Sequence, residues 1–244
     1  CTPPAWLSEK YPEILFVDVD GNQIGHGGRR HACPNNPVYR GHCERIIRRM
    51  CEEFGRDDRI VGWQIDNEVY GNGNRPACAC PVCLQKFRDS LKQRFGTIEK
   101  PNRAWCLSLW SQDYQSFDQI PAPRHNVWHH PSLLQAWERF HSDSYIDFVE
   151  HQARLLHELT DVPIGTDMMM LLGVDHYKIN RELDVVQYNH YHFGEGFRDS
   201  ALWFDYIRPI KKDVPFWNTE TATCWGGGAS YSEPGFCRAN SWLP

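Results

Sequence analysis

Two glutamates lie at the ends of two strand-like runs in this sequence of 244 residues. Glu68 ends the run RIVGWQIDNE, and Glu220 ends the run VPFWNTE. In a barrel of parallel strands the active site forms at the C-terminal ends of the strands, so two such glutamates could converge on one substrate. Paired carboxylates are the usual machinery for cutting glycosidic bonds. The first expectation is therefore acid–base and nucleophilic chemistry on a sugar.

The two carboxylates of a retaining glycosidase have different tasks. One protonates the leaving oxygen and the other attacks the anomeric carbon, from positions about 5 to 5.5 Å apart. Asn67, beside Glu68, could hydrogen-bond the sugar 2-hydroxyl, a contact that strengthens as positive charge develops. The alternative is that each glutamate is a solvated loop residue or a helix cap, which is common after a strand. Their shared place at strand ends favours catalysis.

Three cysteines crowd into the segment Cys78-Ala-Cys80-Pro-Val-Cys83. The ten cysteines of the chain are too sparse and too unevenly spaced for a disulfide scaffold, so this segment indicates a metal site in a reducing compartment. Four thiolates around Zn²⁺ at about 2.3 Å form a closed structural site. Cys43 and Cys51 compete for the fourth position, but both lie on an apolar helix stripe and are typical of small core residues. Buried free thiols are the alternative to a metal.

The bulk composition narrows the class of partner. The net charge is -5, the pI is about 6.2 and no dense Lys/Arg run occurs, which argues against a nucleic-acid binder. Aromatic residues make up 13% of the chain, and although core packing accounts for most of them, sugar sites use such flat faces. No apolar stretch approaches the roughly 20 residues that span a bilayer. We expect a cytoplasmic protein that acts on a neutral or polar small substrate.

Strands and helices alternate along the chain, which implies right-handed βαβ units and a parallel sheet. Residues 14–22 could form a barrel strand or a small hairpin in a loop, and we favour the hairpin. Residues 97–130 form a long aromatic insertion without clear periodicity. Apolar spacing and capping residues predict strands over 60–66, 162–169, 184–191 and 215–220, and helices over 37–54, 84–95, 131–159, a short stretch near 177, and 201–210. Only four core strands can be counted, whereas a closed barrel needs eight. We therefore expect the barrel to extend beyond both ends of this sequence.

Six motifs in a fixed order make the chain resemble glycoside hydrolase family 42, the β-galactosidases of the retaining barrel clan. The motifs are TPPAWL (2–7), GRRHACPNNPVYR (28–40), GWQIDNE (62–68), the cysteine segment (78–83), WSQDY (110–114) and DVV (184–186). The resemblance runs through essentially the whole chain. It implies an α/β fold, a (β/α)8 TIM barrel that is incomplete here, with residues 1–244 covering part of one catalytic domain from the end of strand three through the loop after strand seven.

The resemblance also implies roles for individual residues. Glu68 would be the acid/base at the end of the fourth strand, and Glu220 the nucleophile at the end of the seventh. Arg29 and Asn67 would be sugar ligands, and Trp110 would form part of the wall of the galactose pocket. Simpler alternatives exist, because Arg29 could pair with a carboxylate and Trp110 could be buried in the core of the insertion itself.

A structural zinc and an oligomer follow from the same resemblance. Cys33 occupies the place of the family's remaining zinc cysteine, so Cys33, Cys78, Cys80 and Cys83 would bind Zn²⁺ in a zinc-binding loop region, without a catalytic role for the metal. No organic cofactor is expected. The full-length enzyme is expected to be a homo-oligomer, a trimer. Trp225 follows the nucleophile in the same loop, as a family tryptophan does, but it is not assigned to the sugar.

The expected function is retaining hydrolysis of terminal non-reducing β-D-galactose from galactosides or galacto-oligosaccharides, with no nucleic-acid or membrane partner. The same catalytic pair could act on another β-glycoside, such as an arabinopyranoside, a fucoside or a galactan fragment, because sugar choice depends on pocket contacts. A non-catalytic zinc-stabilised module would instead leave Glu68 and Glu220 far apart or exposed. Unpaired strand edges in an incomplete barrel lead us to expect that the isolated segment folds poorly.

Overall fold

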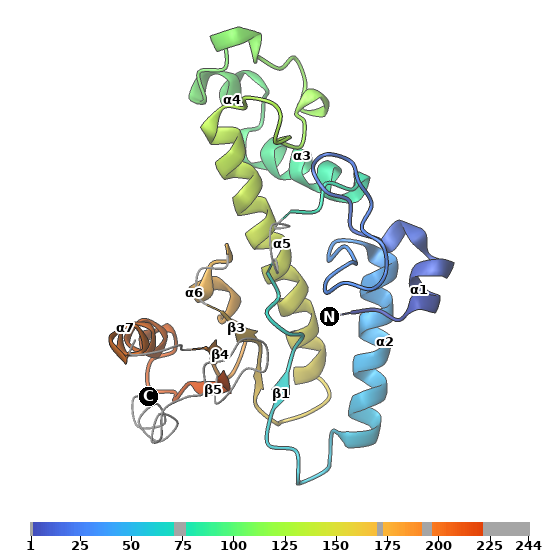
Figure 1. The fold of residues 1–244 in the computed structure, drawn as a ribbon, viewed down its shortest axis with the longest axis vertical. Coiled ribbons are helices and arrows are strands. Elements are labelled where there is room, and N and C mark those ends of the chain that lie inside the picture. Colours follow the sequence, from blue (N-terminus) through green and yellow to red (C-terminus); the bar gives the residue numbers. More distant parts are fainter. Residues whose placement is uncertain (1, 71–76, 170–172, 192–196, 222–244) are drawn as a thin grey trace, which may run out of the picture. The chain divides into compact units, whose positions relative to one another are not determined.

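The computed structural model describes residues 2–70, 77–169, 173–191 and 197–221. The chain divides into two compact units, each made of two stretches of sequence. The first unit contains Cys1–Ile46 and Tyr70–Phe148, and the second contains Ile47–Val69 and Val149–Pro244. Figure 1 colours the elements of both units in chain order.

The first unit is mainly helical. Helix α2 begins as predicted at the Asn36-Pro37 pair, because the Asn36 side chain accepts the backbone N–H groups of Val38 and Tyr39. Helix α3 ends at Gly96, whose φ of 76° is a left-handed conformation that suits glycine. The helices that lie wholly or partly in this unit are α1 (Ala5–Lys10), η1 (Pro12–Ile14), α2 (Pro37–Phe54), α3 (Pro81–Phe95), α4 (Glu99–Ala104), η2 (Leu109–Ser111), η3 (Phe117–Gln119) and α5 (Pro131–His157). The last residues of α2 and of α5 belong to the second unit.

The aromatic insertion has a core of its own, shared with α3 and α5. Its buried members are Phe87, Leu91, Trp105, Leu107, Ile120, Leu133 and Trp137. Phe87 and Leu91 of α3 are buried in this core. On α2, whose apolar stripe carries Cys43 and Cys51, the side chains of Ile46, Met50 and Phe54 are 56%, 42% and 44% exposed, so that stripe is only partly buried.

The second unit carries the parallel strands. They are β1 (Trp63–Gln64), β2 (Ile164–Gly165), β3 (Asp167–Met168), β4 (Gln187–His190) and β5 (Trp217–Thr221), with helices α6 (His176–Ile179), α7 (Phe197–Ile207) and η4 (Arg208–Ile210). Strand β1 pairs with β2, and β3, β4 and β5 lie side by side in that order (Figure 1). Every one of these pairs is parallel, as predicted from the alternation of strands and helices.

The strands are shorter than predicted. The expected strand over 162–169 is divided into β2 and β3 at Thr166, whose hydroxyl donates to the Ile65 carbonyl over 2.6 Å. Gly165 is required by close approach, since a Cβ there would lie 2.7 Å from the Gln187 side chain. All four residues of β4 are buried, as in a parallel sheet covered on both faces.

The hairpin expected near residue 14 occurs as isolated antiparallel bridges, Val17 with Gln23 and Leu15 with Ala32. Across the residues that the structure describes, no helix combines the length and the apolar character that crossing a membrane requires.

Candidate active site

Glu68 follows an irregularity in the parallel ladder of the second unit. The backbone N–H groups of Trp63, Ile65 and Glu68 donate to the carbonyl oxygens of residues 163, 165 and 167, respectively. The last step advances three residues on the β1 side but two on the other side, so one extra residue precedes Glu68. Asp66 and Glu68 take left-handed φ values of 56° and 45° to accommodate it. An extra residue of this kind bends a strand and re-aims the side chain that follows. A left-handed backbone conformation at a residue other than glycine costs about 1–3 kcal/mol and is often found at functional sites.

Glu220 follows a similar irregularity on β5. The register pairs Tyr188 with Asn218 but Asn189 with Glu220, which leaves Thr219 as the extra residue. The Thr219 hydroxyl donates to the Asn189 side-chain oxygen over 2.8 Å. Both predicted catalytic glutamates are therefore placed by an interruption of a parallel ladder, and the two interruptions lie in the same unit.

The Asn189 side chain links the strand ends. Its amide nitrogen donates to Asp167 Oδ2 over 2.6 Å and to Glu68 Oε1 over 3.2 Å. Because Thr219 donates to the amide oxygen, the nitrogen must face the two carboxyl groups. Asn189, Asp167 and Glu68 are 1%, 0% and 5% exposed. The amide is thus a buried, fully used bridge between two acidic side chains.

Asp167 is a third acidic group in this cluster. Burial raises its pKa to about 6, although the hydrogen bond from Asn189 opposes the change, and the charges of Glu220 and Glu68 raise the pKa further. The carboxyl group of Asp167 therefore titrates near neutral pH, whereas that of an ordinary aspartate titrates well below it.

Tyr191, directly after β4, donates its hydroxyl to Glu220 Oε2. Burial, followed by the contact with Glu220, raises the pKa of Tyr191 to about 12, and the charges of Glu68 and Asp167 contribute as well. The phenol is therefore a neutral hydrogen-bond donor at pH 7, which orients the half-buried Glu220 carboxylate.

The predicted sugar ligands belong to both units. Asn67 is half-buried between Asp66 and Glu68, in the second unit. Arg29 is exposed in a turn of the first unit, where the His31 ring bonds the Gly28 carbonyl over 2.9 Å. Trp110 also belongs to the first unit.

Trp110 does not lie in the core of the insertion. Its side chain is 62% exposed, and its ring lies 4.9 Å, centroid to centroid, from that of Trp128, which is 79% exposed. Its φ of 56° is left-handed. The alternative that the insertion buries this residue is therefore wrong. Trp225 lies outside the described residues.

The structure brings the four predicted cysteines together in the first unit. The sulfur atoms of Cys33, Cys78, Cys80 and Cys83 all lie within 4.8 Å of one another, and all four side chains are buried. Tetrahedral ligation with about 2.3 Å metal–sulfur bonds separates ligand sulfurs by about 3.8 Å, so this cluster could hold a metal ion. The competing Cys51 is buried outside the cluster, where burial raises its pKa.

The electrostatics of the cluster also suit a metal. Hydrogen bonding with the neighbouring thiols, that of Cys33 first, lowers the pKa of Cys80. The thiol of Cys78, together with the other cluster thiols and burial, raises the pKa of Cys33. Four thiols at this spacing cannot all be thiolates without a cation, whereas a divalent metal would be compatible with four.

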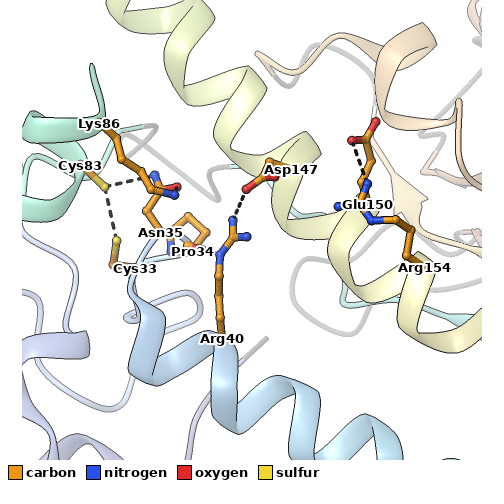
Figure 2. Close-up of polar contacts among 9 residues, drawn as sticks. All are labelled: Cys33, Pro34, Asn35, Arg40, Cys83, Lys86, Asp147, Glu150 and Arg154. Atoms are coloured by element: carbon orange, nitrogen blue, oxygen red, sulfur yellow. Dashed lines mark hydrogen bonds and ion pairs between the residues drawn. The ribbon is translucent and has the colours of Figure 1, made fainter. Parts of the chain in front are cut away.

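Polar groups support the cluster from outside, as Figure 2 shows. The Asn35 amide nitrogen lies 3.4 Å from Cys83 Sγ, and Lys86 Nζ donates to the Asn35 side-chain oxygen over 3.2 Å. Arg40 donates to the Pro34 carbonyl over 2.6 Å and pairs with Asp147 of α5 at 2.7 Å. The loop that carries Cys33 is thereby attached to α2 and α5.

Sequence reasoning missed Asp167, Asn189 and Tyr191. The signal for the first two was a charged and an amide residue inside runs that otherwise indicated buried strands, where polar side chains need partners. For Tyr191 the only signal was its place at the end of a predicted strand. Besides Asp167, the cluster offers two carboxyl groups of different environment, Glu68 and Glu220, with a phenol donor and a fixed amide, which together suit acid catalysis with a nucleophilic carboxylate.

The chain is similar in sequence to several proteins named as β-galactosidases. Residues 1–244 match the family model of glycoside hydrolase family 42, described as Beta-galactosidase. Beta-galactosidase YesZ of Bacillus licheniformis is 34% identical over 235 residues, which cover 96% of this chain and 35% of that protein. A Beta-galactosidase of Thermus thermophilus is 38% identical over 196 residues, covering 79% of this chain and 30% of that protein.

Solved structures agree. The crystal structure of beta-galactosidase from Bacillus circulans sp. alkalophilus matches with a TM-score of 0.90 and 31% identity, over 99% of this chain and 37% of that one. This chain therefore spans about a third of the length of the relatives that it matches. Its α/β fold, with parallel strands and intervening helices, is that of the corresponding part of a family of (β/α)8 barrels.

The free energy of unfolding should fall as the pH rises through about 6, because of Asp167. A raised pKa means that the folded protein binds this proton more tightly than the unfolded chain, so the stabilisation is complete below 3.8 and is lost above 6. The shift corresponds to about 3 kcal/mol. Asp167→Asn should remove this part of the pH dependence, measured by denaturant unfolding between pH 4 and 7. Asp205→Asn, at an exposed site on α7, is the matched control.

Wild type and Asp205→Asn should share one pH slope, and Asp167→Asn should have a smaller one. Identical slopes in all three proteins would contradict the assignment of the perturbed carboxyl group to Asp167.

Proposed function

The chain belongs to glycoside hydrolase family 42, the β-galactosidases, and we propose that the protein that carries it is a retaining β-galactosidase that releases terminal non-reducing β-D-galactose. One observation carries the proposal: at the ends of parallel strands, Glu68 shares the Asn189 amide with the buried Asp167, and Glu220 accepts the hydroxyl of Tyr191. A non-catalytic module predicts exposed or distant glutamates, and the burial of Glu68 argues against that function.

In the first step of the proposed reaction, the Glu220 carboxylate attacks the anomeric carbon. The bond from that carbon to the leaving oxygen breaks, the oxygen keeps the electron pair, and it takes the proton of the Glu68 carboxyl group. The products are a galactosyl ester of Glu220 and the released alcohol. Tyr191 holds the Glu220 carboxylate in one orientation during the attack.

In the second step, the Glu68 carboxylate accepts a proton from water, and the resulting hydroxide oxygen bonds to the anomeric carbon. The bond to Glu220 breaks, its electron pair returns to the carboxylate, and galactose leaves with its original β configuration. Each glutamate ends the cycle in its starting protonation state.

We propose sugar-binding roles for Asn67, Arg29 and Trp110. Asn67 lies next to the acid on the same irregular strand end, which supports a contact with the sugar 2-hydroxyl. Arg29 is an exposed guanidinium able to donate several hydrogen bonds. The exposed ring of Trp110, beside that of Trp128, offers a flat face of the kind that packs against sugar C–H groups.

We propose that the cysteine cluster binds one Zn²⁺ as a structural ion. Four buried thiols at tetrahedral spacing, with a hydrogen-bond donor on Cys83, support this choice over a metal that prefers oxygen ligands. The ion would join the loop of Cys33 to the start of α3, and none of the proposed reaction steps requires it. A cluster of buried thiols also suits a reducing compartment, and we propose the cytoplasm.

We further propose that residues 1–244 are part of one (β/α)8 catalytic domain, with a zinc-binding loop region around 33 and 78–83, and that the complete enzyme is a homo-oligomer. The length of the relatives, about three times that of this chain, supports the first part of this proposal, and the homo-oligomer rests on the family resemblance.

Azide should distinguish the roles of the two glutamates. Glu220→Ala should lower turnover by about 10⁴-fold, and azide, entering where the carboxylate was, should then give an inverted, α-configured galactosyl azide. In Glu68→Ala, azide should instead intercept the galactosyl ester and give the β-configured product. Glu182→Ala, at an exposed residue, should behave as wild type. NMR of the products from an activated aryl galactoside measures the configuration, and a retained product from Glu220→Ala would exclude it as the nucleophile.

Removing the metal should lower stability before it changes catalysis. We expect one Zn²⁺ per chain by elemental analysis, and a chelator should reduce the melting temperature while the surviving folded enzyme keeps its pH profile. Asn35→Ala should weaken zinc binding by about 10-fold to 100-fold, because it removes the donor to Cys83, whereas the exposed Gln85→Ala should not. Prompt loss of activity with an unchanged melting temperature would show that the metal is catalytic instead.

A further inference from the structure

The backbone N–H of Glu68 is accepted by Asp167. The Glu68 N–H lies 3.2 Å from the Asp167 carbonyl oxygen and 3.1 Å from Asp167 Oδ1, so the main chain and side chain of Asp167 both accept it. Glu68 itself has a left-handed φ of 45°, which few residues other than glycine adopt without support. The residue whose N–H group is accepted by two oxygens is therefore also the residue with the unfavourable backbone conformation.

The side chain of Glu68 is tied to Asp167 as well. Asn189 donates one hydrogen bond to Asp167 Oδ2 and one to Glu68 Oε1, and Thr219 fixes the amide by donating to its oxygen. An amide nitrogen has two hydrogens, and both are used. The position of the Glu68 carboxyl group is therefore linked to the Asp167 carboxyl group through a shared partner.

We propose that Asp167 is the positioning residue of the acid/base, which sets both the backbone conformation and the carboxyl orientation of Glu68. The inference rests on the proposed function of Glu68. It assigns to Asp167 no contact with substrate: Asp167 acts only through Glu68 and Asn189.

The need for a carboxyl group at residue 167 follows from the count of donors and acceptors. Oδ1 accepts from Glu68 and Oδ2 accepts from Asn189, so both oxygens must be acceptors. In Asp167→Asn, one of these positions becomes an NH₂ group. If the oxygen stays with the Glu68 N–H, the new NH₂ group faces the NH₂ group of Asn189, and two buried donors meet without an acceptor. Asn189 must then move, and its bond to Glu68 changes.

Exchanging the two side chains restores the pairing. In the double variant Asp167→Asn with Asn189→Asp, the amide at 167 donates to the carboxylate at 189, while Thr219 can still donate to that carboxylate. The oxygen of the amide at 167 remains available to the Glu68 N–H. The exchange does not reproduce the N–H donated to Glu68 Oε1: it places a carboxylate oxygen there, which the Glu68 carboxyl group can meet only with its own proton, so recovery should be incomplete.

A readout specific to the acid separates positioning from general damage. Proton donation matters most for leaving groups of high pKa, such as an alkyl alcohol, and little for dinitrophenolate, which leaves without a proton. The ratio of kcat/KM between a dinitrophenyl galactoside and an alkyl galactoside therefore measures how well Glu68 works in the first chemical step. A change in the amount of folded enzyme alters both rates equally and leaves the ratio unchanged.

The experiment compares wild type, Asp167→Asn, the double variant, Glu68→Ala and the exposed control Asp205→Asn in the full-length protein. For Asp167→Asn we expect kcat/KM to fall about 100-fold on the alkyl galactoside and less than about 5-fold on the dinitrophenyl galactoside. The double variant should recover at least about 10-fold on the alkyl substrate. Asp205→Asn should match wild type on both.

The outcomes distinguish this inference from the proposed function. If Glu68→Ala fails to show the same dependence on the leaving group, the proposed role of Glu68 is wrong. If Glu68→Ala shows it but Asp167→Asn loses rate equally on both substrates, or loses none, Asp167 does not position the acid and the inference is overturned. A double variant no better than Asp167→Asn would also overturn it, because the pairing with Asn189 would not be what matters.

Discussion

The candidate site depends on the two hydrogen bonds that the Asn189 amide donates to Glu68 and Asp167. Without this donor, the buried carboxyl groups of Glu68 and Asp167 would have no hydrogen bond between them. Two acidic groups that are close together and shielded from water repel each other strongly when both are charged. Thr219 determines which side of the amide faces the acids. Because Thr219 is the extra residue that precedes Glu220 on β5, one strand irregularity both displaces Glu220 and orients the bridge to Glu68.

The same arrangement works against stability. Asp66 and Glu68 hold left-handed backbone, and burial raises the pKa of Asp167 well above that of an ordinary aspartate. The surrounding parallel strands tolerate this because their ladder hydrogen bonds resume on either side of each extra residue. In the first unit, buried aromatic packing and the cysteine cluster stabilise loops that have little regular structure of their own. Strain near the chemistry and support elsewhere are the usual compromise in enzymes.

The sequence predicted helices better than strands, for physical reasons. The start of α2 and the end of α3 follow from local signals, the Asn36 cap and Gly96. Helix α5 ends within two residues of the predicted position, because its apolar spacing is repeated over many turns. The strands over 60–66 and 162–169 shorten to two-residue pairs, since extra residues interrupt the ladder and composition does not mark them. Glu68 and Glu220 could be predicted from strand ends, but Asn189 and Asp167 could not, because their roles depend on contacts between segments remote in sequence. The assignment of Cys33 as the fourth metal ligand required the family resemblance, because its separation from Cys78 along the sequence matches no metal-binding pattern.

Covalent trapping tests most directly that these strand ends form a retaining active site. A 2-deoxy-2-fluoro-β-galactoside with a dinitrophenolate leaving group slows hydrolysis of the glycosyl-enzyme, so the ester accumulates and can be located by peptide mass spectrometry. The account predicts one fluorogalactosyl group per active site, attached to Glu220, in wild type, and none in Glu220→Ala. Stoichiometric labelling of any other residue would contradict the account. So would an enzyme that hydrolyses the natural galactoside rapidly but never accumulates the fluorogalactosyl ester.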